Sequence, residues 1–185
     1  IDMDQDFSSY KLLIAPMLYM LRPDVDTRIA AFVENGGTFV ATYWSGIVDE
    51  NDLVFQGGFP GGALRDVMGI WAEEIDALYE DDRNRVVPEP GNPLGLNGPY
   101  EARDYCDLIH SEGAEVLARY GEDFYAGRPA LTVNAYGNGR AYTIASNNDD
   151  AFLRDFYGAL SGTLHLRRAL DVNLPHGVTA QLRTD

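Results

Sequence analysis

The feature that most constrains the fold is a strand–helix–strand pattern between Lys11 and Tyr43. The run Lys11–Pro16 is apolar and ends in proline, which is typical of a buried parallel strand. Pro23 stands where a helix can begin, and Gly36-Gly37 stand where it can end. Between them, apolar residues recur at helical spacing, at Val25, Ile29, Phe32 and Val33. With the next strand at Thr38–Tyr43, this pattern predicts two parallel strands joined by a right-handed crossover.

The second half of the chain is predicted to be mainly antiparallel. Its clearest signal is a hairpin in which Asn138-Gly139 joins the strands Pro129–Tyr136 and Arg140–Ala145. Further strands are expected at Ile70–Leu78, Asn84–Pro88, Tyr100–Ile109, Glu115–Tyr120 and Gly177–Arg183, with helices at Ala63–Met68 and from Asp149 or Asp150 to Leu160. The predicted fold class is therefore α/β, a three-layer sandwich with an antiparallel extension. Because Ile1–Asp4 is also predicted as a strand, we expect an upstream strand and helix to be missing from this chain.

Composition excludes several kinds of partner. The net charge of -15 repels the phosphates of nucleic acids and anionic membranes. No apolar run approaches the roughly 18 residues of a membrane helix. Cys106 is the single cysteine, so no internal disulfide is possible and a cytoplasmic location is expected. The histidines His110, His165 and His176 lack the spacing of metal ligands, and no cofactor is predicted.

A long segment after the second strand is the main candidate for an interaction surface. Residues Trp44–Gly62 are rich in glycine and acid, yet they carry several large apolar side chains. A loop of this length and composition either folds under the domain or meets another surface. The candidate residues for an interface, or for a position near a bound sugar, are Trp44, Ile47, Val48, Phe55 and Phe59.

Catalytic patterns in the chain are weak. Ser45 lies on a turn that lacks the leading glycine of a nucleophile elbow, and Cys106 lies four residues before His110. His110 and Glu112 form a His-x-Glu pattern, which is common by chance. Acidic pairs such as Glu73/Glu74, Glu80/Asp81 and Asp149/Asp150 are not set among apolar residues that would separate their pKa values. No catalytic, cofactor-binding or metal-binding residue is therefore predicted.

Several runs of the sequence point to a known family. They occur in order at Tyr10–Leu21, Phe32–Val40, Ser45–Asp52, Gly57–Gly61, Gly69–Trp71 with Glu73–Leu78, and Asp123–Ala130. Together they resemble the central domain of the β-galactosidases of glycoside hydrolase family 42, and the resemblance extends through nearly the whole chain.

The resemblance implies a fold and a role. Its fold would be flavodoxin-like and related to class I glutamine amidotransferases, without their nucleophile. Residues 1–176 would form a subunit-associating domain of a bacterial homotrimer, and residues 177–185 would begin or lead to a C-terminal β-domain. The parent enzyme would remove terminal β-galactose by a retaining mechanism, with both catalytic glutamates and most galactoside contacts in a barrel outside this chain.

Two other functions remain open at this point. One is an amidotransferase-like hydrolase that uses Cys106 or Ser45. The other is a module that binds a sugar through its aromatic side chains.

Overall fold

The computed structural model describes residues 5–167, 169–170, 172, 174–175 and 177–181. Within these residues the chain forms one nine-stranded sheet and three helices. The strands are β1 (Leu12–Ala15), β2 (Thr38–Thr42), β3 (Ile70–Ala77), β4 (Asn84–Pro88), β5 (Tyr100–Ser111), β6 (Glu115–Tyr120), β7 (Pro129–Tyr136), β8 (Gly139–Ile144) and β9 (Ser146–Asn148). The helices are α1 (Val25–Glu34), α2 (Leu64–Met68) and α3 (Asp150–Thr163).

The sheet is parallel at one edge and antiparallel elsewhere. Its strand order is β1-β2-β8-β7-β6-β4-β5-β3, and β9 pairs with β5 outside this path. β1, β2 and β8 run parallel, and the remaining strand pairs are antiparallel. The α/β class and the antiparallel second half predicted from the sequence are thus confirmed.

The predicted strand–helix–strand unit is formed as expected. Leu13 pairs with Phe39 across β1 and β2, and the apolar face of α1 is buried. α1 ends at a glycine pair for a steric reason as well as a conformational one. Gly36 has a positive φ of 104°, and a Cβ on Gly37 would overlap the Phe32 ring.

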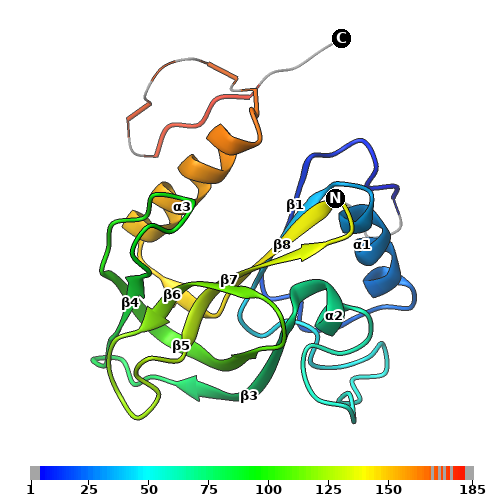
Figure 1. Cartoon of the computed structure of the whole chain (residues 1–185), viewed down its shortest axis with the longest axis horizontal. Coiled ribbons are helices and arrows are strands. Elements are labelled where there is room, and N and C mark those ends of the chain that lie inside the picture. Colours follow the sequence, from blue (N-terminus) through cyan, green and yellow to red (C-terminus); the bar gives the residue numbers. More distant parts are fainter. Residues whose placement is uncertain (1–4, 168, 171, 173, 176, 182–185) are drawn as a thin grey trace.

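Helices cover both faces of the sheet (Figure 1). Asn134 donates from Nδ2 to the carbonyl oxygens of Asp66 and Val67 in α2, whereas the opposite face of the sheet carries Tyr142 against Phe156 of α3. α1 packs on the same side as α2 and contacts it. α3 begins at Asp149, whose Oδ1 accepts a hydrogen bond from the N–H of Phe152 at 2.8 Å.

Two elements differ from the sequence prediction. The short strand β9 was not predicted, and it forms because β5 supplies a hydrogen-bonding edge beside it. The predicted strand Gly177–Arg183 is not formed over residues 177–181, since an alternating pattern makes a strand only where another strand pairs with it. Ile1–Asp4, His176 and Arg183 lie outside the described residues.

None of the helices in the described ranges is both long enough and apolar enough to cross a lipid bilayer.

Candidate functional site

Two loops meet at the carboxyl ends of β1 and β2. One covers residues 16–21 and the other covers residues 44–62, and backbone hydrogen bonds join them. The N–H of Gly46 donates to Leu18 O at 2.7 Å, and the N–H of Leu21 donates to Val48 O at 2.9 Å. Isolated bridges pair Met20 with Val48 and Val48 in turn with Val54. The long loop is therefore a fixed part of the domain.

The structure places the predicted interface residues at different depths. Ile47 and Val48 are buried within their own domain. Trp44, Phe55 and Phe59 are half-buried, and the Phe55 ring lies so close to Gly61 that a Cβ there would overlap it. Much of this apolar area thus packs under the loop.

Other apolar side chains of these loops point to solvent. Leu53 is 63% exposed and Val54 is 50% exposed. Met17, Tyr19 and Met20 of the shorter loop are also exposed. The sequence prediction missed these residues as a group. Pro16 was the available signal, because apolar residues that follow a strand-ending proline lie beyond the sheet.

An aromatic cluster lies beside the same loops, and a buried carboxyl group bonds to the backbone of one of its members. The Trp44 ring lies 5.2 Å from the Tyr105 ring and 6.0 Å from the Tyr19 ring, and the rings of Tyr43 and Tyr105 stack at 5.8 Å. Asp107 Oδ2 accepts a hydrogen bond from the Trp44 backbone N–H at 3.0 Å. Trp44 adopts a left-handed backbone conformation here, with φ at 56°.

Burial dominates the electrostatics of Asp107. It raises the pKa of this carboxyl to about 7, and the hydrogen bond from Trp44 opposes the shift only in part. Asp107 Oδ1 and Trp44 Nε1 are buried and have no hydrogen-bond partner among the described residues. The carboxyl group is thus held in a place where its charge is costly.

The candidate nucleophiles are not assembled with a base. Ser45 Oγ donates to Thr42 O at 2.7 Å and accepts from the Leu18 N–H, so its hydroxyl serves the backbone. Cys106 is fully buried, and burial raises the pKa of its thiol to about 11. His110 instead stacks on Trp71, with ring centroids 4.9 Å apart, and its Nε2 lies 2.7 Å from Glu73 Oε2. The geometry gives the amidotransferase-like alternative no support.

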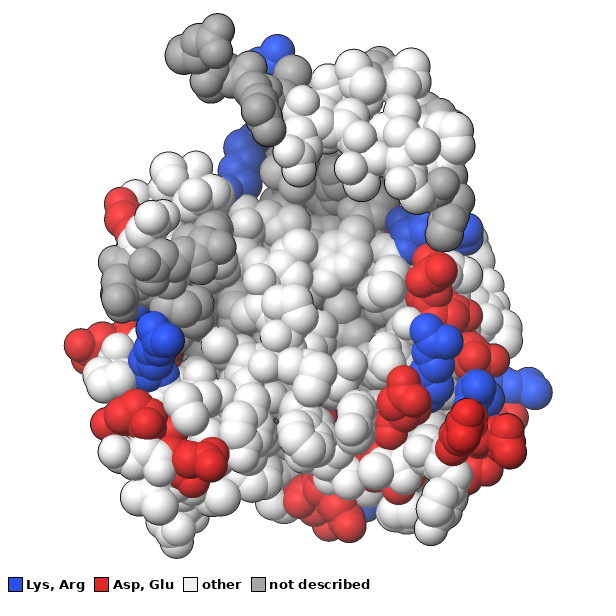
Figure 2. Space-filling view, turned by 180° about the vertical axis from the view of Figure 1, so that it is seen from behind, with Lys and Arg blue, Asp and Glu red and all other residues white. Residues whose placement is uncertain are grey.

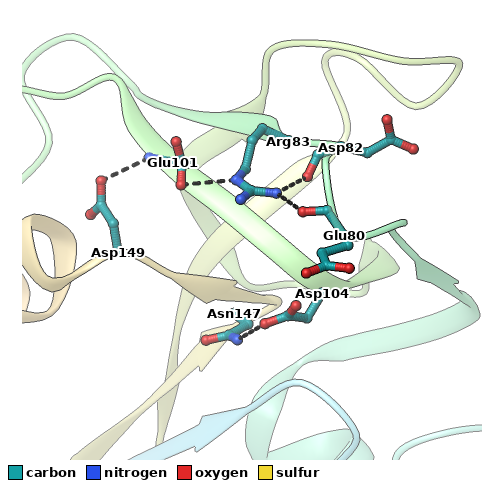
Figure 3. Close-up of polar contacts among 7 residues, drawn as sticks. All are labelled: Glu80, Asp82, Arg83, Glu101, Asp104, Asn147 and Asp149. Atoms are coloured by element: carbon teal, nitrogen blue, oxygen red, sulfur yellow. Dashed lines mark hydrogen bonds and ion pairs between the residues drawn. The ribbon is translucent and has the colours of Figure 1, made fainter.

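Two of the carboxylates considered for catalysis, Glu73 and Asp149, have structural partners. Glu73 lies in contact with Arg128 as well as His110, and hydrogen bonds from both lower its pKa. Asp149 caps α3 with one oxygen and accepts from the Glu101 N–H with the other, at 3.1 Å. Arg83 joins Glu101 to the carbonyl oxygens of Glu80 and Asp82, as Figure 3 shows. These contacts give the carboxylates of Glu73, Asp149 and Glu101 structural roles, whereas Glu80 takes part through its backbone carbonyl oxygen.

A metal centre is also not assembled from these side chains. Over the residues that the structure describes, no group of three or more His, Cys, Asp or Glu side chains is placed to hold a metal ion. On the face displayed in Figure 2, charged side chains gather along both flanks and leave the centre uncharged.

Comparisons with known proteins identify close relatives. A family model described as "Beta-galactosidase trimerisation domain" matches residues 1–167. The protein named Beta-galactosidase Pbg, from Clostridium perfringens, is 63% identical over 185 residues, which are all of this chain and 27% of that protein. Beta-galactosidase BglY from Alicyclobacillus acidocaldarius is 55% identical over 184 residues, again 100% of this chain and 27% of that protein.

A solved structure agrees with these matches. The crystal structure of a β-galactosidase from Rahnella sp. R3 is 58% identical in sequence and superposes with a TM-score of 0.93. The match covers 97% of this chain and 26% of that one. The chain thus spans about a quarter of the length of the relatives that it matches.

Proposed function

The chain belongs to the family of β-galactosidase trimerisation domains, and on that premise we propose that it is the non-catalytic subunit-association domain of a β-galactosidase. The observation that carries the proposal is the family match over residues 1–167, together with 63% identity across the whole chain to a named β-galactosidase.

The parent protein would hydrolyse terminal non-reducing β-D-galactose residues from a galactoside. Its catalytic glutamates, in a retaining mechanism, would lie in a barrel outside this chain, which spans 27% of its relatives. The local geometry supports a catalytic site that lies outside this chain. Ser45, Cys106 and His110 are each engaged with neighbours that leave no nucleophile beside a base.

The finer domain assignment is part of the same proposal. Residues 1–176 would form the association domain, with a flavodoxin-like arrangement around the parallel strands β1, β2 and β8. Residues 177–185 would lead to a C-terminal β-domain. The parent would act in the bacterial cytoplasm as a homotrimer, without nucleic acid or membrane partners, and the charge of -15 supports that exclusion.

The loop of residues 44–62 would face the neighbouring subunit, close to its sugar pocket. In this role Trp44, Phe55 and Phe59 are half-buried and lie near the contact, while Ile47 and Val48 support the loop from within. The loop's backbone bonds to residues 18–21 keep it in one conformation, which reduces the entropy lost on association.

The decisive experiment uses the full-length polypeptide that carries this chain. Sedimentation velocity should give a trimer, and the same preparation should hydrolyse a nitrophenyl β-D-galactoside. The 185-residue chain alone should not turn over that substrate. A full-length protein that is monomeric at micromolar concentration, or a 185-residue chain with activity of its own, would refute the assignment.

A further inference from the structure

Five exposed apolar side chains form one surface at the carboxyl end of β1. The loop-tip surface consists of Met17, Tyr19, Met20, Leu53 and Val54. These residues come from two segments that are more than thirty positions apart, and the bridges from Met20 to Val48 and from Val48 to Val54 bring them together. Figure 1 shows the cyan loop that carries Leu53 and Val54 on the side of the molecule away from α3.

Hydrogen bonds hold the tip of this surface rigid. Asp49 Oδ1 accepts from the backbone N–H groups of Asn51 and Leu53 at 2.8 Å and 3.0 Å. The Asp49 N–H donates in turn to Leu53 O at 2.9 Å, which closes the turn. Leu53 and Val54 are therefore presented to solvent by a fixed turn. A mobile loop could fold such side chains inward, so a rigid turn that exposes them indicates a contact with another surface.

Charge restricts which regions of this chain can meet a second copy. With a net charge of -15, two copies repel each other wherever their carboxylates face one another. In the loop-tip surface, by contrast, two of the three carboxylates of the turn, Asp49 and Asp52, already have partners, and the third, Glu50, is exposed. Asp49 is used in the turn, and Asp52 Oδ1 accepts from the Tyr19 hydroxyl at 3.3 Å. Approach of an apolar surface there leaves fewer carboxylates to desolvate.

We propose that the loop-tip surface docks on a second copy of this chain and carries the apolar part of the subunit contact. The inference rests on the proposed function, because self-association supplies the occupant. It moves the contact from the predicted residues Ile47 and Val48, which are buried, to neighbours that are exposed. In a closed ring of three copies every subunit uses this surface once, so one substitution weakens all three contacts.

The test is a double variant of the full-length polypeptide, Leu53→Asp with Val54→Asp. Because the two side chains are 63% and 50% exposed in the single copy, the substitutions should leave the fold intact and place charge in the contact. We expect the trimer to dissociate at least about tenfold more readily in sedimentation velocity. The matched control is Tyr79→Asp with Phe124→Asp, whose side chains are 83% and 73% exposed elsewhere. The control should sediment as the wild type does.

The outcomes separate this inference from the proposal on which it rests. If the wild-type protein is itself monomeric, the proposed function fails first. If the wild type is a trimer and the Leu53/Val54 variant keeps the same dissociation constant, the loop-tip surface is not the contact and only this inference fails. A far-ultraviolet circular dichroism melt checks the fold. Should the double variant melt early, the milder Leu53→Ser variant replaces it, and unchanged association of that variant also counts against the surface.

Discussion

Replacing Asp107 by asparagine should remove a pH-dependent instability from this domain. Asp107 is buried, its Oδ2 accepts a hydrogen bond from the Trp44 N–H, and burial raises the pKa of its carboxyl from 3.8 to about 7. Between these two values the folded chain holds one proton more than the unfolded chain does. The free energy of unfolding therefore falls as pH rises through this window, and the loss is complete above the folded pKa.

The magnitude follows from the size of the shift. A rise from 3.8 to about 7 corresponds to a loss on the order of 4 kcal/mol above pH 7. Of that amount, about 3 kcal/mol is lost between pH 5 and pH 8, because part of the window lies below pH 5. The asparagine side chain of the Asp107→Asn variant would be neutral throughout, and its amide oxygen could still accept from the Trp44 N–H. Its buried NH2 group costs roughly 1–3 kcal/mol at every pH if it finds no acceptor.

The assay is urea unfolding of wild-type and Asp107→Asn chains at several values of pH from about 5 to about 8, the range over which the linkage acts. The other titrating groups are common to both proteins, so they cancel in the difference of unfolding free energies. From about pH 5 to about pH 8, the free energy of unfolding of the variant should rise by about 3 kcal/mol relative to that of the wild type. If the two profiles run parallel, the carboxyl of Asp107 carries no burial cost in the folded chain, and the reasoning is wrong.

Three further substitutions and one chemical modification test the packing and the helix cap. Gly139→Ala should lower the free energy of unfolding by about 1–3 kcal/mol, because its Cβ would overlap the carbonyl oxygen of Val33. In α3, a Cβ on Gly158 has no atom within 4 Å, so Gly158→Ala should raise the free energy of unfolding by up to about 1 kcal/mol. Urea titrations that rank the two glycines equally would refute this. Asp149→Ala should cost about 1 kcal/mol through the lost cap of α3, measured by thermal melting, and an unchanged melt would mean that the cap contributes nothing. Cys106, buried with its thiol pKa raised to about 11, should react with an aromatic disulfide reagent in urea but not in the native chain at about pH 8, and rapid native labelling would contradict its burial.

Most secondary structure was predictable because its signals are local. The helical spacing from Val25 to Val33 sets the conformation of a short segment, and α1 forms where it was expected. The hairpin of β7 and β8 also forms, but its two-residue turn is Gly137-Asn138, one position before the predicted Asn138-Gly139, because Tyr136 pairs with Gly139. β9 and the predicted strand Gly177–Arg183 show the opposite case. A three-residue strand such as Ser146–Asn148 exists only because β5 lies beside it, and an alternating segment without such a neighbour stays irregular over residues 177–181.

The candidate interface shows the same limit at the level of side chains. The sequence marked the loop of residues 44–62 as unusually apolar for its length, and that observation does not depend on the fold. It did not separate Val48, which is buried, from Val54, which is half exposed. These two valines pair with each other across the loop, and the partner of Val48 on the other side is Met20.

Residue order and spacing are enough to specify the parallel α/β unit, the antiparallel second half and the family resemblance, because each of these depends on the residue types of short consecutive segments. Packing in three dimensions settles which apolar side chains of the loops face water, and it brings the carboxyl of Asp107 to the Trp44 N–H. Exposure and pKa depend on atoms brought together from distant positions, such as residues 44 and 107, and no local pattern in the chain records those distances.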